Sequence, residues 1–169
     1  MPNFLIVLLA ALVPMVFGFI WYHPKTFGTV WMKVASMTEE KMKSGKMGLT
    51  FLLSYVLSIL LGFILFGIVV HQSQLLSLFM HIPDFQGQMA AGSGVYFEQF
   101  TTLSTQFDGA FRTFGHGAMH GGVVAFFVVL PVMTTNALFE RKSAKYVFVN
   151  VGYWFVTLLV MGGILCQWG

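Results

Sequence analysis

Five histidines are the side chains of this sequence best suited to proton transfer or metal binding near neutral pH. His116 and His120 stand four residues apart, so a helix would present both imidazoles on one face. This spacing suits two ligands of one metal ion. Two imidazoles do not complete a four-coordinate site, and His71 and His81 are the candidates to complete it.

Three interpretations of these histidines stay open. The one we favour is a packed His116/His120 pair that hydrogen-bonds to backbone, Thr or Asn groups. The others are a proton- or ligand-linked role, and a metal cluster of His71, His81, His116 and His120, where neighbouring Met thioethers would suit copper(I). The segment between the pair lacks the Glu of a zinc hydrolase. We therefore expect no bound metal and no cofactor.

The acidic residues do not form a catalytic set. All six fall in loops or at the ends of apolar segments, so carboxylate-coupled ion pumping has no evident carrier. The sequence also lacks a phosphate-binding glycine loop and a Ser-His-Asp set. We therefore assign no catalytic residue and expect that the protein is not an enzyme.

Four uncharged apolar segments must position these side chains. They cover residues 4–21, 48–70, 117–138 and 146–168, each near or above the roughly 18–20 residues that cross a bilayer. With 57% hydrophobic and 9% charged residues, the sequence predicts an all-α integral membrane protein: a single domain, 1–169, with four transmembrane helices in a bundle. Further amphipathic helices are expected at the membrane interface in the first and second loops.

The basic residues indicate the orientation. Five lysines lie between the first two spans, three basic residues lie between the last two, and Arg112 alone lies between the second and third. The positive-inside rule then places both termini outside, in the periplasm if the membrane is a bacterial inner membrane. No basic leader precedes the first span, which we interpret as an uncleaved anchor. The charge distribution gives no reason to expect nucleic-acid binding.

The segment 72–114 is long for a connection between membrane helices. From Tyr96 to Phe114 its apolar residues recur every three or four positions, which predicts one amphipathic helix. This helix would lie on the outer leaflet or cap the bundle. Alternatively, its aromatic side chains would bind a partner protein; these candidates are Phe97, Phe100, Phe107 and Phe111.

Small residues predict close packing of the third span. Gly117 and Gly121 form a GxxxG pair, which lets two helix backbones approach each other in lipid. Pro131 should distort this span, and Thr134, Thr135 and Asn136 are expected to bond the freed backbone groups.

Several stretches are specific in combination, although none is so alone. They are Gly18-Phe19-Ile20-Trp21-Tyr22-His23-Pro24, Phe27-Gly28, Trp31-Met32, Met37-Thr38-Glu39-Glu40, His116-Gly117-Ala118-Met119-His120-Gly121, Thr135-Asn136-Ala137-Leu138-Phe139-Glu140-Arg141, Asn150-Val151-Gly152-Tyr153-Trp154 and Met161-Gly162. Together they resemble a bacterial membrane family known as domain-of-unknown-function family 1761. The resemblance covers about three quarters of the chain and implies a four-span bacterial membrane protein, without a known reaction or functional residues. The second loop is longer than the connection usual in that family.

Two functions follow as hypotheses. The first is a non-catalytic interaction subunit, which binds another membrane or periplasmic protein or a second copy through the Phe-rich segment. The second is a small oligomeric transporter or channel. Its polar pathway would use Tyr55, His116, His120, Asn136 and Asn150.

Overall fold

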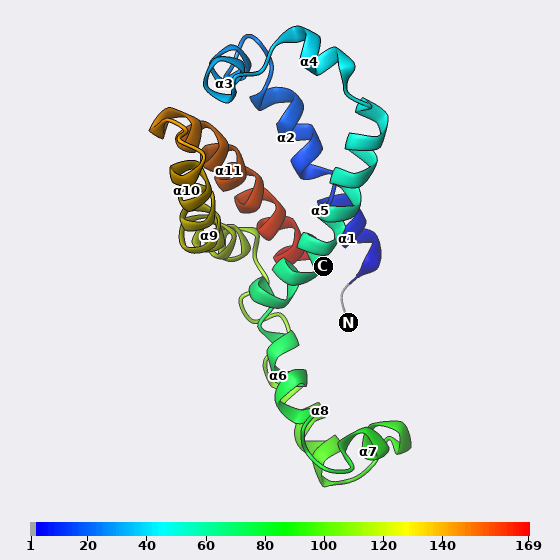
Figure 1. The fold of residues 1–169 in the computed structure, drawn as a ribbon. Coiled ribbons are helices and arrows are strands. Elements are labelled where there is room, and N and C mark those ends of the chain that lie inside the picture. Colours follow the sequence, from blue (N-terminus) through cyan, green and yellow to red (C-terminus); the bar gives the residue numbers. More distant parts are fainter. Residues whose placement is uncertain (1–2) are drawn as a thin grey trace.

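A computed structural model describes residues 3–169 and is all-helical over that range (Figure 1). Four helical segments are long and apolar enough to cross a membrane: Phe4–Trp21, Met47–Val69, Phe114–Phe139 and Ala144–Trp168. These bounds lie within about three residues of the expected ones. The predicted fold class, an all-α bundle of four membrane-spanning segments, is confirmed.

The segments are divided into shorter elements by local irregularities. In chain order these are α1 (Phe4–Ala10), α2 (Val13–Trp21), α3 (Gly28–Ala35), α4 (Glu39–Ser44), α5 (Met47–Val69), α6 (Gln72–Phe79), α7 (Phe85–Ala91), α8 (Val95–Gln106), α9 (Phe114–Val124), the π-helical turn η1 (Ala125–Val129), α10 (Leu130–Phe139) and α11 (Ala144–Trp168).

The first span is interrupted between α1 and α2, near Pro14, which has no backbone N–H to donate. The Leu12 N–H bonds to the carbonyl three residues back rather than to that of Leu8. Tyr55 from α5 donates its hydroxyl to the Leu8 carbonyl at 3.2 Å, and Tyr153 from α11 donates to the Pro14 carbonyl at 2.7 Å. Neighbouring helices thus satisfy carbonyl groups around the break, as a membrane interior requires.

The third span contains a π-helical turn, η1, directly before Pro131. The Leu130 N–H bonds to the Ala125 carbonyl, five residues back, which widens the helix at the position that Pro131 disturbs. The expected compensation by Thr134 is wrong, because its buried hydroxyl oxygen has no hydrogen-bond partner. Asn136 is exposed on α10.

Helix α11 is the central element and packs against α1, α2, α5, α9 and α10. Leu158, Met161 and Leu165 are fully buried along it. The closest approach is to α9, where a Cβ added at Gly117 would lie 2.8 Å from the Gly162 carbonyl carbon. A Cβ at Gly121 would lie 2.6 Å from the Leu158 carbonyl carbon. The two glycines therefore let α9 contact α11 within the same chain.

The segment 72–106 forms an insert that projects from the bundle (Figure 1). Its helices α6 and α8 pack against each other, and Phe79, Phe85 and Phe100 meet with ring centroids 5.3–5.5 Å apart. The predicted continuous helix from Tyr96 to Phe114 is wrong, because α8 ends at Gln106. After it, Gly109 and Phe111 adopt left-handed backbone angles, with φ of 71° and 60°, that turn the chain back to the bundle.

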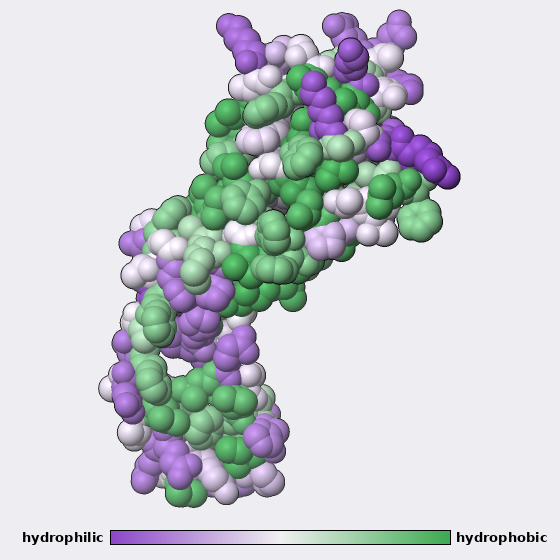
Figure 2. Space-filling model, turned by 90° about the vertical axis from the view of Figure 1, so that its left-hand side faces the viewer, coloured by the Kyte–Doolittle hydropathy of each residue, from purple (hydrophilic) through white to green (hydrophobic). Residues whose placement is uncertain are grey.

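Figure 2 shows hydrophilic residues at one end of the molecule and again at the joint and rim of the insert, with a largely apolar surface over the bundle between them. One end carries the loops 22–46 and 140–145 with eight of the nine basic residues, and we call it the basic end. There α4 begins after Thr38, whose hydroxyl accepts a hydrogen bond from the Lys41 N–H at 3.2 Å. The opposite end carries the insert and both ends of the described chain (Figure 1). We call it the histidine end.

Candidate functional site

Three histidines converge at the histidine end, where the insert meets the bundle. His71 lies at the joint between α5 and α6, while His116 and His120 lie in the first two turns of α9. The His71 and His116 Nε2 atoms are 2.9 Å apart, and those of His116 and His120 are 3.1 Å apart. One ring nitrogen from each of the three lies within 4.8 Å of the others. His71 is exposed and the other two are half-buried.

Hydrogen bonding among neutral imidazoles does not fully satisfy this arrangement. An Nε2 atom offers either one proton or one lone pair, in the plane of its ring. The His116 Nε2 faces two other Nε2 atoms at hydrogen-bonding distance, so it can form only one well-directed bond at a time. A cation between the three nitrogen atoms would accept a lone pair from each. These three side chains could therefore hold a metal ion.

Local structure fixes the two histidines of α9. Thr113 is the N-cap of that helix, and its hydroxyl accepts a hydrogen bond from the His116 N–H at 3.2 Å. The helix therefore starts directly before His116, and His120 follows one turn later on the same side. The Phe111 ring stacks on His116 with centroids 5.0 Å apart and an interplanar angle of 27°. This contact restricts the rotation of the His116 ring.

A glutamine holds His71 near the other two. Gln72, the first residue of α6, donates from Nε2 to the Phe107 carbonyl at 2.8 Å and to the Ala110 carbonyl at 2.9 Å. These bonds join the start of the insert to the segment that leads into α9. His71 is thereby placed beside His116, although 45 residues separate them in the chain.

The fourth histidine of the sequence-based cluster does not join it. His81 is exposed at the far end of α6, and the three-membered ligand set does not include it. The length of α6 separates it from His71, since an α-helix rises about 1.5 Å per residue. From the sequence alone, His71 and His81 were equal candidates, because both lie near the ends of predicted helices.

The remaining residues of the predicted polar pathway lie apart from this site. Tyr55 bonds to the backbone of α1, and Asn136 is exposed on α10. Asn150 lies toward the basic end, where its side chain accepts a hydrogen bond from the Tyr22 hydroxyl at 3.0 Å and donates to the Tyr146 carbonyl at 2.8 Å. Burial, followed by the charges of neighbouring tyrosines, raises the pKa of Tyr22, so the hydroxyl keeps its proton. The five residues do not line one path.

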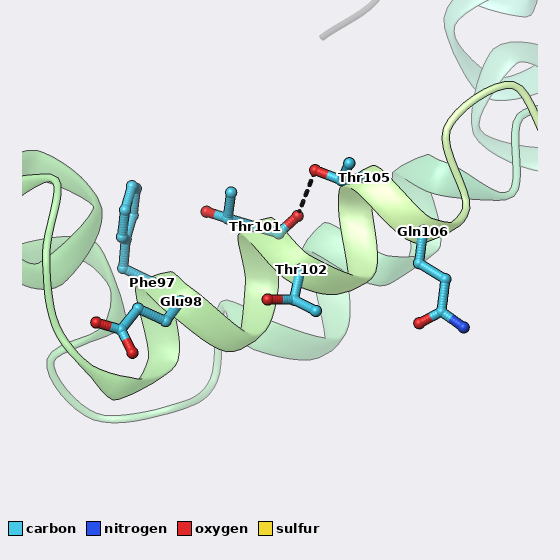
Figure 3. Close-up of a pocket in the computed structure, with 6 residues that line it drawn as sticks. All are labelled: Phe97, Glu98, Thr101, Thr102, Thr105 and Gln106. Carbon is cyan, nitrogen blue, oxygen red and sulfur yellow. Dashed lines mark hydrogen bonds between the residues drawn. The ribbon is translucent and has the colours of Figure 1, made fainter.

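The four predicted partner-binding phenylalanines have different environments. Phe100 packs into the aromatic cluster of the insert, and Phe97 is half-buried. Phe107 and Phe111 are 48% and 66% exposed, but Phe111 also covers His116. A shallow hollow lies along α8; Figure 3 shows that its lining side chains all come from this one helix. They are Phe97, Glu98, Thr101, Thr102, Thr105 and Gln106.

The match to a known protein family covers almost the whole chain. Residues 5–166 match the family described as "Protein of unknown function (DUF1761)". The chain belongs to this family. No curated protein and no solved structure matches it. For this DUF1761 protein, the function therefore has to be argued from the site itself.

Proposed function

We propose that this DUF1761 protein is a multi-pass membrane protein that binds one first-row transition-metal ion through His71, His116 and His120. The convergence of three imidazole Nε2 atoms from two segments of the chain carries the proposal. Imidazole is a common ligand of zinc, copper, nickel and iron. This proposal replaces the hydrogen-bonded pair that the sequence favoured, because the fold adds His71 to that pair.

The distances are close to those that a bound ion requires. Zinc bonds imidazole nitrogen at about 2.0–2.1 Å, so three nitrogen atoms in a tetrahedral arrangement lie about 3.3 Å apart. Two of the three separations, His71 to His116 at 2.9 Å and His116 to His120 at 3.1 Å, are within a few tenths of an ångström of that value. The third pair, His71 and His120, lies within 4.8 Å. Side-chain rotations that adjust this third separation would bring all three nitrogen atoms to bonding distance.

We also propose that the site faces the periplasm of a bacterial inner membrane. Eight of the nine basic residues lie in the two loops of the basic end, which the positive-inside rule assigns to the cytoplasm. The histidine end, with both ends of the described chain, then lies on the opposite side (Figure 1). In this orientation the site meets metal ions that enter from outside the cell.

A partner-binding role is the second candidate, and the projecting insert supports it. A lobe with an aromatic cluster of its own, held away from the bundle, is accessible to another protein (Figure 1). Of the predicted set, Phe107 is 48% exposed and lies directly after α8, at the foot of the insert. The transport hypothesis has less support, because Tyr55, Asn136 and Asn150 lie apart from one another and from the two histidines.

Metal analysis of the purified protein tests the main proposal. We expect one zinc or copper ion per chain, either on isolation or after titration with Zn²⁺ in detergent. His116→Gln should lower the affinity by more than the roughly 10–100-fold lost when a residue that only supports a ligand is changed. Gln keeps hydrogen-bonding groups of similar reach but is a poor ligand, so folding should be retained.

His81→Gln is the matched control, because His81 is an exposed histidine of the insert that lies outside the cluster. It should leave the stoichiometry and the affinity unchanged. A wild-type protein that folds but binds no stoichiometric metal would overturn the proposal. Equal losses in His116→Gln and His81→Gln would indicate non-specific binding and would also overturn it.

A further inference from the structure

The insert is connected to the bundle by two short non-helical stems. The first is the joint after α5, where Val70 has extended backbone angles (φ −105°, ψ 95°) before α6 begins. The second is the segment 107–113, which contains the two left-handed residues Gly109 and Phe111. Joints of a few residues between packed bodies are where hinge rotations occur in proteins.

Each body is packed mainly within itself. In the insert, α8 contacts α6 and α7, and the aromatic cluster buries Phe85 almost completely. In the bundle, α11 is the helix around which the others pack. In Figure 2 an opening is visible through the molecule at the foot of the insert, between the two bodies. The stems are therefore the main physical link that sets the angle of the insert.

The histidine site lies across this link. His71 belongs to the first stem and is the residue that precedes α6, whereas His116 and His120 are held in α9 of the bundle. The two sides are joined here by the Gln72 bonds to the second stem and by the contact of the His71 and His116 nitrogen atoms at 2.9 Å. The second stem is in turn bonded to the bundle: the Phe111 carbonyl accepts from Cys166 Sγ at 3.3 Å, and the Arg112 guanidinium donates to the Gly169 carbonyl. His71 is exposed, so water competes for its hydrogen bond.

We propose that metal occupancy of the three-histidine site locks the hinge between the insert and the bundle. The inference rests on the proposed metal-binding function. Without metal, a hydrogen bond in contact with water holds His71 to His116, and the insert samples a range of angles. With metal, one ion is bonded to His71 on the insert side and to two histidines of α9, so rotation about Val70 would break a coordination bond. The ion thereby sets how the insert is presented to the aqueous phase.

Distance measurements by electron paramagnetic resonance test this inference on the full chain. One spin label is attached at Thr102→Cys on α8 and the other at Leu5→Cys on α1, both exposed positions. The native Cys166 is buried and should not react with the label. We expect a broad distance distribution in metal-free protein, a narrow one with one equivalent of Zn²⁺, and a return to the broad one after chelation.

Variants separate this inference from the proposed function. His71→Gln should leave the distribution broad at Zn²⁺ concentrations that saturate the remaining ligands, while His81→Gln should respond like the wild type. If one Zn²⁺ binds per chain and the distribution does not change, the hinge lock is overturned and metal binding stands. If no Zn²⁺ binds, the proposed function falls and the hinge lock falls with it. Reversible narrowing in His71→Gln equal to that of the wild type would also overturn the hinge lock.

Discussion

The close contact between α9 and α11 predicts that glycine-to-alanine substitutions at two positions of α9 change the stability of the protein differently. A Cβ at Gly121 would lie 2.6 Å from the Leu158 carbonyl carbon, whereas ordinary contact begins near 3.4 Å. The obstacle is backbone, which cannot rotate away, so α9 would have to withdraw by at least about 0.8 Å. Such overpacking costs about 1–3 kcal/mol, and a backbone obstacle places Gly121→Ala near the upper limit.

Gly115→Ala is the control, because a Cβ at Gly115 meets nothing within 4 Å. Alanine stabilises a helix by about 0.5–1 kcal/mol relative to glycine, so this change should be neutral or stabilising. For a chain of this length about 1 kcal/mol shifts the melting temperature by roughly 2–4 °C. Thermal melting in detergent should therefore show a drop of about 6–12 °C for Gly121→Ala and none for Gly115→Ala. Equal melting temperatures for the two variants would refute the close approach of α9 to α11.

Three further predictions concern other parts of the structure. Tyr55→Phe and Tyr153→Phe each remove a hydrogen bond to the interrupted first span. Each should lower the free energy of unfolding, measured by thermal melting, by about 1 kcal/mol. Phe127→Leu, at a 70% exposed site, should cost less than either, and an equal cost would contradict the assigned bonds. Phe85→Ala should lower the free energy of unfolding of the insert by about 3–5 kcal/mol, and hydrogen exchange should become faster in residues 72–106 only. Faster exchange throughout α11 would contradict an insert that folds as its own unit. A cysteine introduced as Gly45→Cys should react with an impermeant reagent only after the inner membrane is breached, and labelling in intact cells would reverse the proposed orientation.

The sequence predicted the long elements closely because each has a strong local signal. An uncharged apolar run of some 20 residues has one stable arrangement in a bilayer, a helix with its backbone groups bonded internally. The spans at 4–21, 48–70, 117–138 and 146–168 follow from this requirement alone, within about three residues.

The signal for the insert was also local, but it was misleading. The regular spacing of Phe100, Phe107 and Phe111 predicted one long helix, because apolar side chains at such intervals share a helix face. In the structure these residues pack in different parts of the molecule. Phe100 fills the core of the insert, and Phe111 turns back through a left-handed conformation to cover His116. Periodicity does not reveal which body a side chain packs against.

The sequence by itself determined the all-helical membrane architecture and the placement of His116 and His120 on one helix face. Both depend on hydropathy and on the geometry of a single helix. Only the tertiary structure decided that His71 and not His81 stands beside that pair. The choice depends on the Gln72 bonds and on the turn at Gly109 and Phe111, which bring residues 45 positions apart to within 2.9 Å. Such contacts between distant segments have no period or spacing in the sequence, because they arise where two separately packed bodies meet.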